Sequence, residues 1–144
     1  MKCMNKMMGA LLGGAMLMGA LALPTTTLAA DRSKMVIQVS DSNPATWNLA
    51  LNNAKNVQND MGKDNVELEI VAYGPGIGML KADSEVSNRV SEAVDAGVQV
   101  VACENTMRGQ KLTKADMNAK TGYVQAGVVE ILQRQKQGYA YLRP

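Results

Sequence analysis

The sequence predicts an α/β fold: a three-layer sandwich in which a mostly parallel, five-stranded sheet carries helices on both faces. Short runs rich in Val, Ile and Ala, typical of strands buried on both faces, alternate with segments of helical periodicity. This alternation requires right-handed crossover connections, which place helices on the faces of the sheet. We expect a flavodoxin-like strand order with strands 2-1-3 adjacent, and functional groups in loops at the carboxyl ends of the strands.

The first thirty residues have the pattern of a cleaved secretory signal. Lys2 and Lys6 precede an apolar run over 7–23, and small residues close the segment. We therefore expect residues 1–30 to be removed and residues 31–144 to form one domain in the periplasm or outside the cell. Without the two signal lysines, 13 basic residues balance 13 acidic ones. Partners such as nucleic acid or an anionic membrane are not expected.

The first half of the domain predicts two strands separated by a helix. A strand over 34–40 leads to polar residues and Pro44, which are typical of a helix start. The helix runs to a left-handed cap at Gly62, with Trp47 on its apolar face as a core or subunit-contact residue. The second strand, over 65–73, begins with alternating apolar residues, which favours a position nearer the edge of the sheet.

The second half continues the alternation. We expect a helix over 84–96, a strand over 98–102, short helices within 104–120, a short strand at 123–124, a helix over 125–137 and a last strand over 139–142. Asn105 and the Thr113–Asp116 capping box are candidate helix starts. The apolar residues expected to face the core from the last long helix are Val128, Val129, Ile131 and Leu132.

The residues that are absent exclude several classes of chemistry. The chain has no His, so a Ser-His-Asp or Cys-His couple is excluded and the commonest zinc ligand is missing. The predicted domain keeps one cysteine, Cys103, because Cys3 lies in the signal, and one cysteine cannot form an intrachain disulfide. We expect no metal site and no cofactor.

Cys103 is the strongest nucleophile candidate. It stands at the carboxyl end of a predicted buried strand, where Asn105 and Arg108 could surround the sulfur with N–H groups and positive charge and stabilise a thiolate. Such a thiolate could attack sulfane sulfur and carry it as a persulfide. The alternative is a buried cysteine that completes a hydrophobic strand.

Two further strand-end loops are candidate binding segments. One contains Asp41 and Asn43, and the other contains Gly74, Gly76 and Gly78. The glycine-rich loop fits neither phosphate-binding template, although its N–H groups could hold a small anion. The alternative is a structural turn, because glycine and proline serve sharp reversals after buried strands.

The domain resembles the DsrE/DsrF-like family, particularly its small exported members. The resemblance covers nearly everything from Lys34 to Pro144 and rests on the segments Val-Ile-Gln-Val-Ser-Asp, Trp-Asn-Leu-Ala-Leu-Asn-Asn-Ala-Lys-Asn, Val-Ala-Tyr-Gly-Pro-Gly-Ile, Val-Ala-Cys-Glu-Asn-Thr-Met-Arg-Gly, Ala-Gly-Val-Val-Glu and Gly-Tyr-Ala-Tyr. It implies a DsrE-like α/β sandwich that assembles as a homo-oligomer, a trimer or hexamer. Sulfur-relay members carry persulfide on a strand-end cysteine followed by an Arg-Gly pair, and Cys103 with Arg108-Gly109 looks like that arrangement.

Our hypothesis from the sequence is a sulfur-handling protein that carries persulfide on Cys103 and exchanges sulfur with a partner protein. The alternative is a homo-oligomer that binds a small ligand or serves a structural role without covalent chemistry. Exposure of the Cys103 sulfur separates the two, because a thiol sealed in the sheet could not meet a partner.

Overall fold

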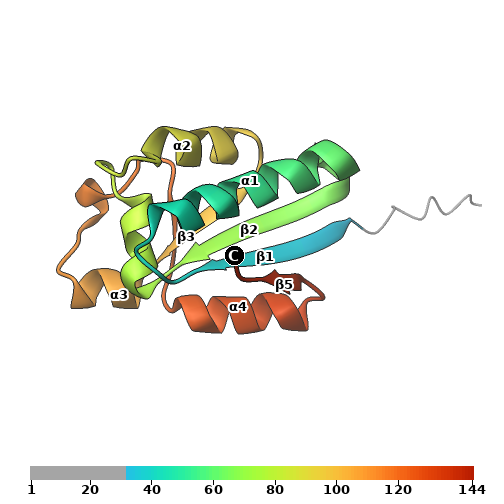
Figure 1. Cartoon of the computed structure of the whole chain (residues 1–144). Helices are drawn as coiled ribbons and strands as arrows, with labels where there is room; N and C mark the ends of the chain where they lie inside the picture. Colours follow the sequence, from blue (N-terminus) through green and yellow to red (C-terminus); the bar gives the residue numbers. More distant parts are fainter. Residues whose placement is uncertain (1–31) are drawn as a thin grey trace, which may run out of the picture.

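The computed structural model describes residues 32–144, so the predicted signal lies outside the described residues. The described chain is one α/β unit of five strands interleaved with helices (Figure 1). Its strands are β1 Ser33–Val39, β2 Val66–Ala72, β3 Gln99–Cys103, β4 Gly122–Val124 and β5 Ala140–Leu142. Its α-helices are α1 Pro44–Met61, α2 Ser87–Asp95, α3 Glu104–Gly109 and α4 Gly127–Lys136. The 3-10 helices are η1 Lys63–Asn65, η2 Gly74–Leu80 and η3 Lys114–Asp116. None of the described helices is long and apolar enough to cross a membrane.

The sheet is entirely parallel, with the strand order β4-β3-β2-β1-β5. The predicted parallel five-stranded sheet with helices on both faces is therefore confirmed, but the expected adjacency of strands 2-1-3 is wrong. Strand β2 stands between β1 and β3, so the loop that follows β2 separates the loops that follow β1 and β3. All three loops still share the carboxyl edge of the sheet, as parallel strands require.

One face of the sheet is covered by α1 and α2 (Figure 1). Ile37, Ile70 and Val100 from three adjacent strands pack beneath these helices. Trp47 is 8 % exposed and belongs to this core, so the structure favours its core role over a subunit contact. The predicted start and end of α1 are confirmed, since the Asn43 side chain accepts a hydrogen bond from the Ala45 N–H and Gly62 has a positive φ.

The opposite face is covered by α4 (Figure 1). Of the residues predicted to face the core, Ile131 is buried, whereas Val128, Val129 and Leu132 are 58 %, 47 % and 52 % exposed. The prediction was wrong for these three because α4 lies on the sheet through Gly127, Ile131 and the stem of Arg134. Gly127 permits this approach, since a Cβ there would lie 3.1 Å from the Cβ of Tyr73.

Strand β2 is the central strand, so its predicted position near an edge was wrong. The alternation that suggested an edge comes from Glu67, which is half-buried, and Glu69, which is buried against Arg134 of α4. Glu69 is 1 % exposed, and its Oε2 lies 2.5 Å from Arg134 Nε. The Tyr139 hydroxyl donates a hydrogen bond to Glu67. A half-buried and a buried carboxylate at alternate positions thus give the sequence the pattern of a solvent-facing strand.

Two helix starts in the second half differ from expectation. Helix α2 begins at Ser87 rather than at Ser84, and α3 begins at Glu104 with Cys103, not Asn105, at its N-cap position. The capping box of Thr113 and Asp116 is confirmed and opens η3.

Candidate functional site

Cys103 ends β3 at the carboxyl edge of the sheet, on the face that α4 covers. Its cross-strand neighbour is Val124 of β4, and α4 begins nearby at Gly127. The residue is 4 % exposed. Cys103 is therefore almost inaccessible to solvent, although it lies where the ends of β3 and β4 meet the starts of α3 and α4.

Polar hydrogens surround the Cys103 sulfur. Burial is the largest single influence on the thiol and disfavours its ionisation, but the Thr106 hydroxyl and the N–H groups of Gly127, Thr106 and Asn105 together outweigh it. The pKa of the Cys103 thiol is therefore lowered from its usual value. The side chain makes no regular capping hydrogen bond to α3, so these groups act as oriented dipoles. The Cys103 thiolate therefore forms more easily than burial alone would allow.

Thr106 connects the cysteine to the glycine-rich loop. Its Oγ1 accepts a hydrogen bond of 2.9 Å from the Gly74 N–H, which leaves the hydroxyl hydrogen for the sulfur. Gln110 adds a second link, donating from Nε2 to the Gly74 carbonyl at 3.2 Å. The loops after β2 and β3 therefore form one unit around Cys103.

Asn105 and Arg108, predicted to stabilise the thiolate, both lie in α3, the helix that follows Cys103. The Asn105 N–H is shared, because it favours the thiolate and also donates to the Gln125 carbonyl at 3.1 Å. The Arg108 guanidinium donates to the Asn105 side-chain oxygen and is not among the main influences on the pKa of Cys103. Arg108 therefore reaches the site through Asn105.

The other predicted binding positions have structural contacts. Asp41 Oδ1 accepts a hydrogen bond of 2.9 Å from the Asn43 N–H, and Asn43 in turn caps α1. A Cβ at Gly76 would lie 2.3 Å from the Val39 carbonyl oxygen, and one at Gly78 would lie 3.1 Å from the Trp47 ring. These glycines let η2 pack against the end of β1 and against α1. Of the five positions, only Gly74 is hydrogen-bonded to the surroundings of Cys103.

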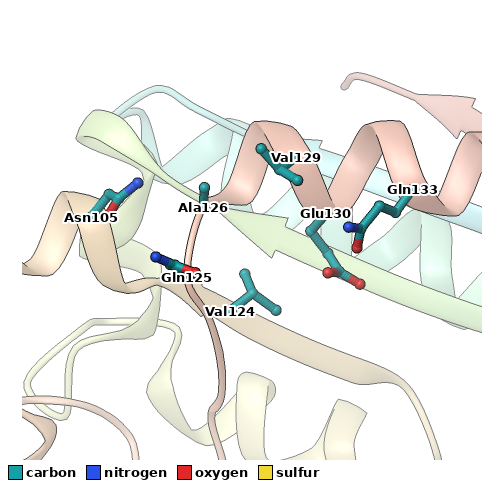
Figure 2. Close-up of a pocket in the computed structure, with 7 residues that line it drawn as sticks. All are labelled: Asn105, Val124, Gln125, Ala126, Val129, Glu130 and Gln133. Carbon is teal, nitrogen blue, oxygen red and sulfur yellow. The ribbon is translucent and has the colours of Figure 1, made fainter.

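A pocket of about 490 Å³ opens beside the cysteine, between α4, the end of β4 and the start of α3 (Figure 2). Its lining consists of Asn105, Val124, Gln125, Ala126, Val129, Glu130 and Gln133. Apolar side chains, amides and one carboxylate thus line a volume suited to a small molecule. Among residues 32–144, no three Asp, Glu or Cys side chains are grouped so that they could hold a metal ion.

Sequence reasoning missed Thr106, Gly127 and this pocket. Thr106 follows the cysteine by three residues, a spacing that a helix N-cap at Cys103 would have indicated. Gly127 is 24 positions away, counting along the sequence, and its contribution depends on α4 starting over the end of β3. No local pattern carries that information.

Comparisons with known proteins agree with this architecture. The DsrE/DsrF-like family profile matches residues 33–144. A protein of unknown function from Methanobacterium thermoautotrophicum is 34 % identical, with a TM-score of 0.74 over 78 % of this chain and 99 % of that one.

A second protein of unknown function, from Bacteroides thetaiotaomicron, shares the fold at 18 % identity. Its TM-score is 0.64 over 78 % of this chain and 95 % of that one. No curated protein matches the sequence. The family match spans most of the sequence and the described fold, and the chain therefore belongs to the DsrE/DsrF-like family.

Proposed function

We propose that this DsrE/DsrF-like protein carries sulfane sulfur as a persulfide on Cys103. The observation that supports the proposal is the surroundings of the sulfur, where polar hydrogens from Thr106, Asn105 and Gly127 lower the pKa of a thiol that burial alone would keep protonated. A cysteine that only filled the core would need no such groups. Their arrangement suits a sulfur atom that works as an anion.

The chemistry requires no general base. The Cys103 thiolate attacks the outer sulfur of a persulfide donor, and the donor's thiolate leaves with the electron pair of the broken S–S bond. The product persulfide is also an anion at neutral pH, so the same N–H and O–H groups stabilise the loaded carrier. Transfer to an acceptor thiolate repeats the exchange in the opposite direction.

The 4 % exposure of Cys103 favours the rival function, a homo-oligomer without covalent chemistry that binds a small ligand or serves a structural role. A carrier must therefore open the cover of the sulfur. The segments of Asn105 and Gln125 follow the paired residues Cys103 and Val124 and are joined by a backbone hydrogen bond of 3.1 Å. We infer that they form this cover. Separating them is a local movement that leaves the sheet intact.

Intact-mass measurement tests the proposal. Purified protein treated with a persulfide donor should gain one sulfur atom, and the gain should disappear after reduction and in Cys103→Ser. If wild-type protein gains no sulfur, or Cys103→Ser gains as much, the carrier function is wrong and the rival stands. The donor hydrodisulfide is small enough to test the thiol before any larger partner is known.

We also propose that the protein forms a homo-oligomer. Val128 and Leu132 are more than half exposed, lie four residues apart and share one side of α4. Tyr141, 43 % exposed, lies on β5, which packs beside α4 (Figure 1). We call these three residues the α4–β5 apolar surface. Exposed apolar side chains of this size on two neighbouring elements are typical of a contact surface, and a second copy of the chain is its simplest partner.

Export to the periplasm or the medium remains part of the proposal, supported by the pattern of residues 1–30. Cell fractionation with mass spectrometry of the amino terminus tests it. A protein that begins near residue 31 outside the cytoplasm is expected. An uncleaved protein in the cytoplasm would contradict it.

A further inference from the structure

We propose that the pocket beside Cys103 binds the sulfur donor in the form of a small aminothiol persulfide. The inference rests on the proposed function, because it names the class of compound from which Cys103 takes sulfur. The position, charge and dimensions of the pocket support it.

The pocket lies against the cover of the sulfur. Val124, which lines it, is the cross-strand partner of Cys103. Asn105 lines it and contributes an N–H group that favours the thiolate, while the neighbouring Ala126 precedes the Gly127 N–H that does the same. In Figure 2, Asn105, Gln125 and Ala126 lie together at the α3 end of the pocket. A molecule seated there would contact Asn105 and Gln125, the residues inferred to cover the sulfur, and would reach the thiolate when they move.

The charge of the pocket favours a cation. Glu130 is the only ionisable residue in its lining, which contains no Lys or Arg. Arg134 Nε lies 2.8 Å from Glu130 Oε1 and also 2.5 Å from Glu69 Oε2, so one guanidinium serves two carboxylates. Glu67 adds a third carboxylate nearby through Tyr139. Lys34 adds a second cation on the Tyr139 side, with Nζ 5.9 Å from the ring centre. At the pocket end Glu130 shares Arg134 with Glu69, so a ligand ammonium group would give its carboxylate a cation of its own.

The lining also limits the rest of the ligand. Val124 and Val129 offer contacts for a short aliphatic chain, and Gln125 and Gln133 offer amide donors and acceptors. Glu130 follows Gly127 by three residues, a helical rise of about 4.5 Å. The site that binds the ammonium is thus within a few bonds of the sulfur cover, which matches a thiol with a two- or three-carbon spacer.

The transfer balances without another reactant. The Cys103 thiolate attacks the terminal sulfur of the donor R–S–SH, in which the group R carries the ammonium. A new Sγ–S bond forms and the donor S–S bond breaks. The products are the Cys103 persulfide and the aminothiolate, which takes the electron pair and then a proton from water. The sulfane sulfur keeps its oxidation state throughout.

The test compares two organic donors of equal length that differ in charge, and uses hydrodisulfide as a third donor without an organic group. Cysteamine persulfide carries an ammonium group, 2-mercaptoethanol persulfide carries a hydroxyl in its place, and hydrodisulfide has no organic body. Rates of Cys103 persulfidation are measured by quenched intact-mass spectrometry in wild type and Glu130→Gln. Dividing each variant rate by the wild-type rate for the same donor removes the donor's intrinsic reactivity.

Glu130→Gln should slow the cysteamine donor by about fivefold and leave the hydroxyl donor and hydrodisulfide nearly unchanged, as expected for loss of a partly exposed ion pair. Glu104→Gln is the matched control, since it removes a carboxylate next to Cys103 that does not line the pocket. It should alter the rates for all donors by one common factor.

A second pair of variants tests the volume of the pocket. Val129→Trp places a large ring at the pocket wall, whereas Leu49→Trp alters an equally exposed residue on α1, since both are 47 % exposed. Val129→Trp should slow both organic donors at least about fivefold relative to hydrodisulfide, and Leu49→Trp should not.

The outcomes distinguish the two proposals. If hydrodisulfide loads Cys103 but neither Glu130→Gln nor Val129→Trp discriminates among donors, the pocket is not the donor site, and a protein donor or an unassisted reaction replaces it while the carrier function stands. If no donor loads Cys103, the carrier function fails and this inference fails with it.

Discussion

The Thr106 hydroxyl accepts a hydrogen bond from the Gly74 N–H and offers its own hydrogen to the Cys103 sulfur, so this one side chain affects both the stability of the protein and the pKa of the thiol. Thr106→Val removes the hydroxyl and leaves the Gly74 N–H without its acceptor. We expect the free energy of unfolding to fall by about 1–2 kcal/mol. The pKa of the Cys103 thiol should rise, because the first of the groups that favour the thiolate is lost.

Ultraviolet thiolate absorbance followed against pH, together with chemical denaturation, measures both effects. Thr106→Ser keeps the hydroxyl and is the matched control. An unchanged titration in Thr106→Val would mean that the backbone N–H groups alone hold the thiolate.

Gly76 and Gly109 give opposite predictions for the same substitution. A Cβ at Gly76 would lie 2.3 Å from the Val39 carbonyl oxygen and 2.9 Å from the Ser40 N, which are backbone atoms that cannot rotate away. Gly76→Ala should therefore destabilise the protein by about 3 kcal/mol or prevent folding.

Gly109→Ala, with no atom within 4 Å of its Cβ, should be neutral or gain up to about 1 kcal/mol in α3. Thermal denaturation of both variants checks the contrast. A stable Gly76→Ala would show that η2 can move away from β1, and the structural role assigned to this glycine would be wrong.

At the scale of single residues, the sequence predicted several residues of the Cys103 site but not the contacts that they make. Cys103, Asn105 and Gly74 were predicted as site residues and lie together, because each closely follows or ends a buried strand. Thr106 and Gly127 were not predicted. Their contributions depend on the cap position of α3 and on the seating of α4, which are tertiary facts.

Among the elements, the contact between α4 and β2 carries the clearest pH dependence. Burial raises the pKa of Glu69, Arg134 opposes the rise, and Glu130 adds to it. The folded-state pKa lies above the usual 4.5, so the folded protein holds this proton more firmly than the unfolded chain. The contribution of Glu69 to stability is therefore greatest below that pH and declines as the pH rises through the folded pKa.

Glu69→Gln cannot ionise, so its stability relative to wild type should increase as the pH rises from the usual carboxyl pKa of 4.5 through the higher pKa of folded Glu69. Chemical denaturation at several pH values measures the difference. Arg134→Met should show the opposite trend: its free energy of unfolding, relative to wild type, should fall as the pH rises. At high pH the decrease should reach about 3–5 kcal/mol, because the Glu69 carboxylate is then buried without its cation. A pH-independent difference between Glu69→Gln and wild type would show that Glu69 titrates alike in both states.

Strand β2 and helix α4 show why the sequence predicted that these segments form a strand and a helix but did not predict where they lie in the fold. A half-buried Glu67 and a buried Glu69 give β2 the period of an edge strand. Local patterns cannot reveal that Arg134 lies opposite Glu69. In α4 the valines and Leu132 have helical spacing, but the side that packs on the sheet was misassigned. Ile131, which was predicted, packs on the sheet together with Gly127 and the stem of Arg134, which no hydrophobicity pattern selects.

For the molecule as a whole, the family and the parallel α/β architecture followed from the sequence, while the strand order did not. Both 2-1-3 and 3-2-1 orders use right-handed crossovers between buried parallel strands. The choice between them depends on which helix covers which face. Here α1 and α2 share one face, and α4, which lies on the other, keeps an exposed apolar side.

The exposed apolar side of α4 predicts how copies of the chain assemble. If the α4–β5 apolar surface joins copies of the chain, Leu132→Glu places a charge in the contact and should separate the oligomer into single chains. Leu49→Glu, at a residue of similar exposure on α1, should leave the assembly unchanged. Light scattering after size-exclusion chromatography gives the mass of each species. The folded chain should survive both changes, because Leu132 is 52 % exposed and contributes little to the core.

The assembly prediction also bears on the sulfur chemistry. Glu130 and Gln133 of the pocket and the apolar residues Val128 and Leu132 all belong to α4. If copies meet through the apolar residues, separating them should leave the thiol titration of Cys103 intact, since the groups that favour its thiolate all belong to one chain. A Leu132→Glu protein that becomes a single chain and loses this titration would instead show that a second copy completes the site. If wild type is already a single chain, the apolar surface binds something other than this protein, and the proposed homo-oligomer is wrong.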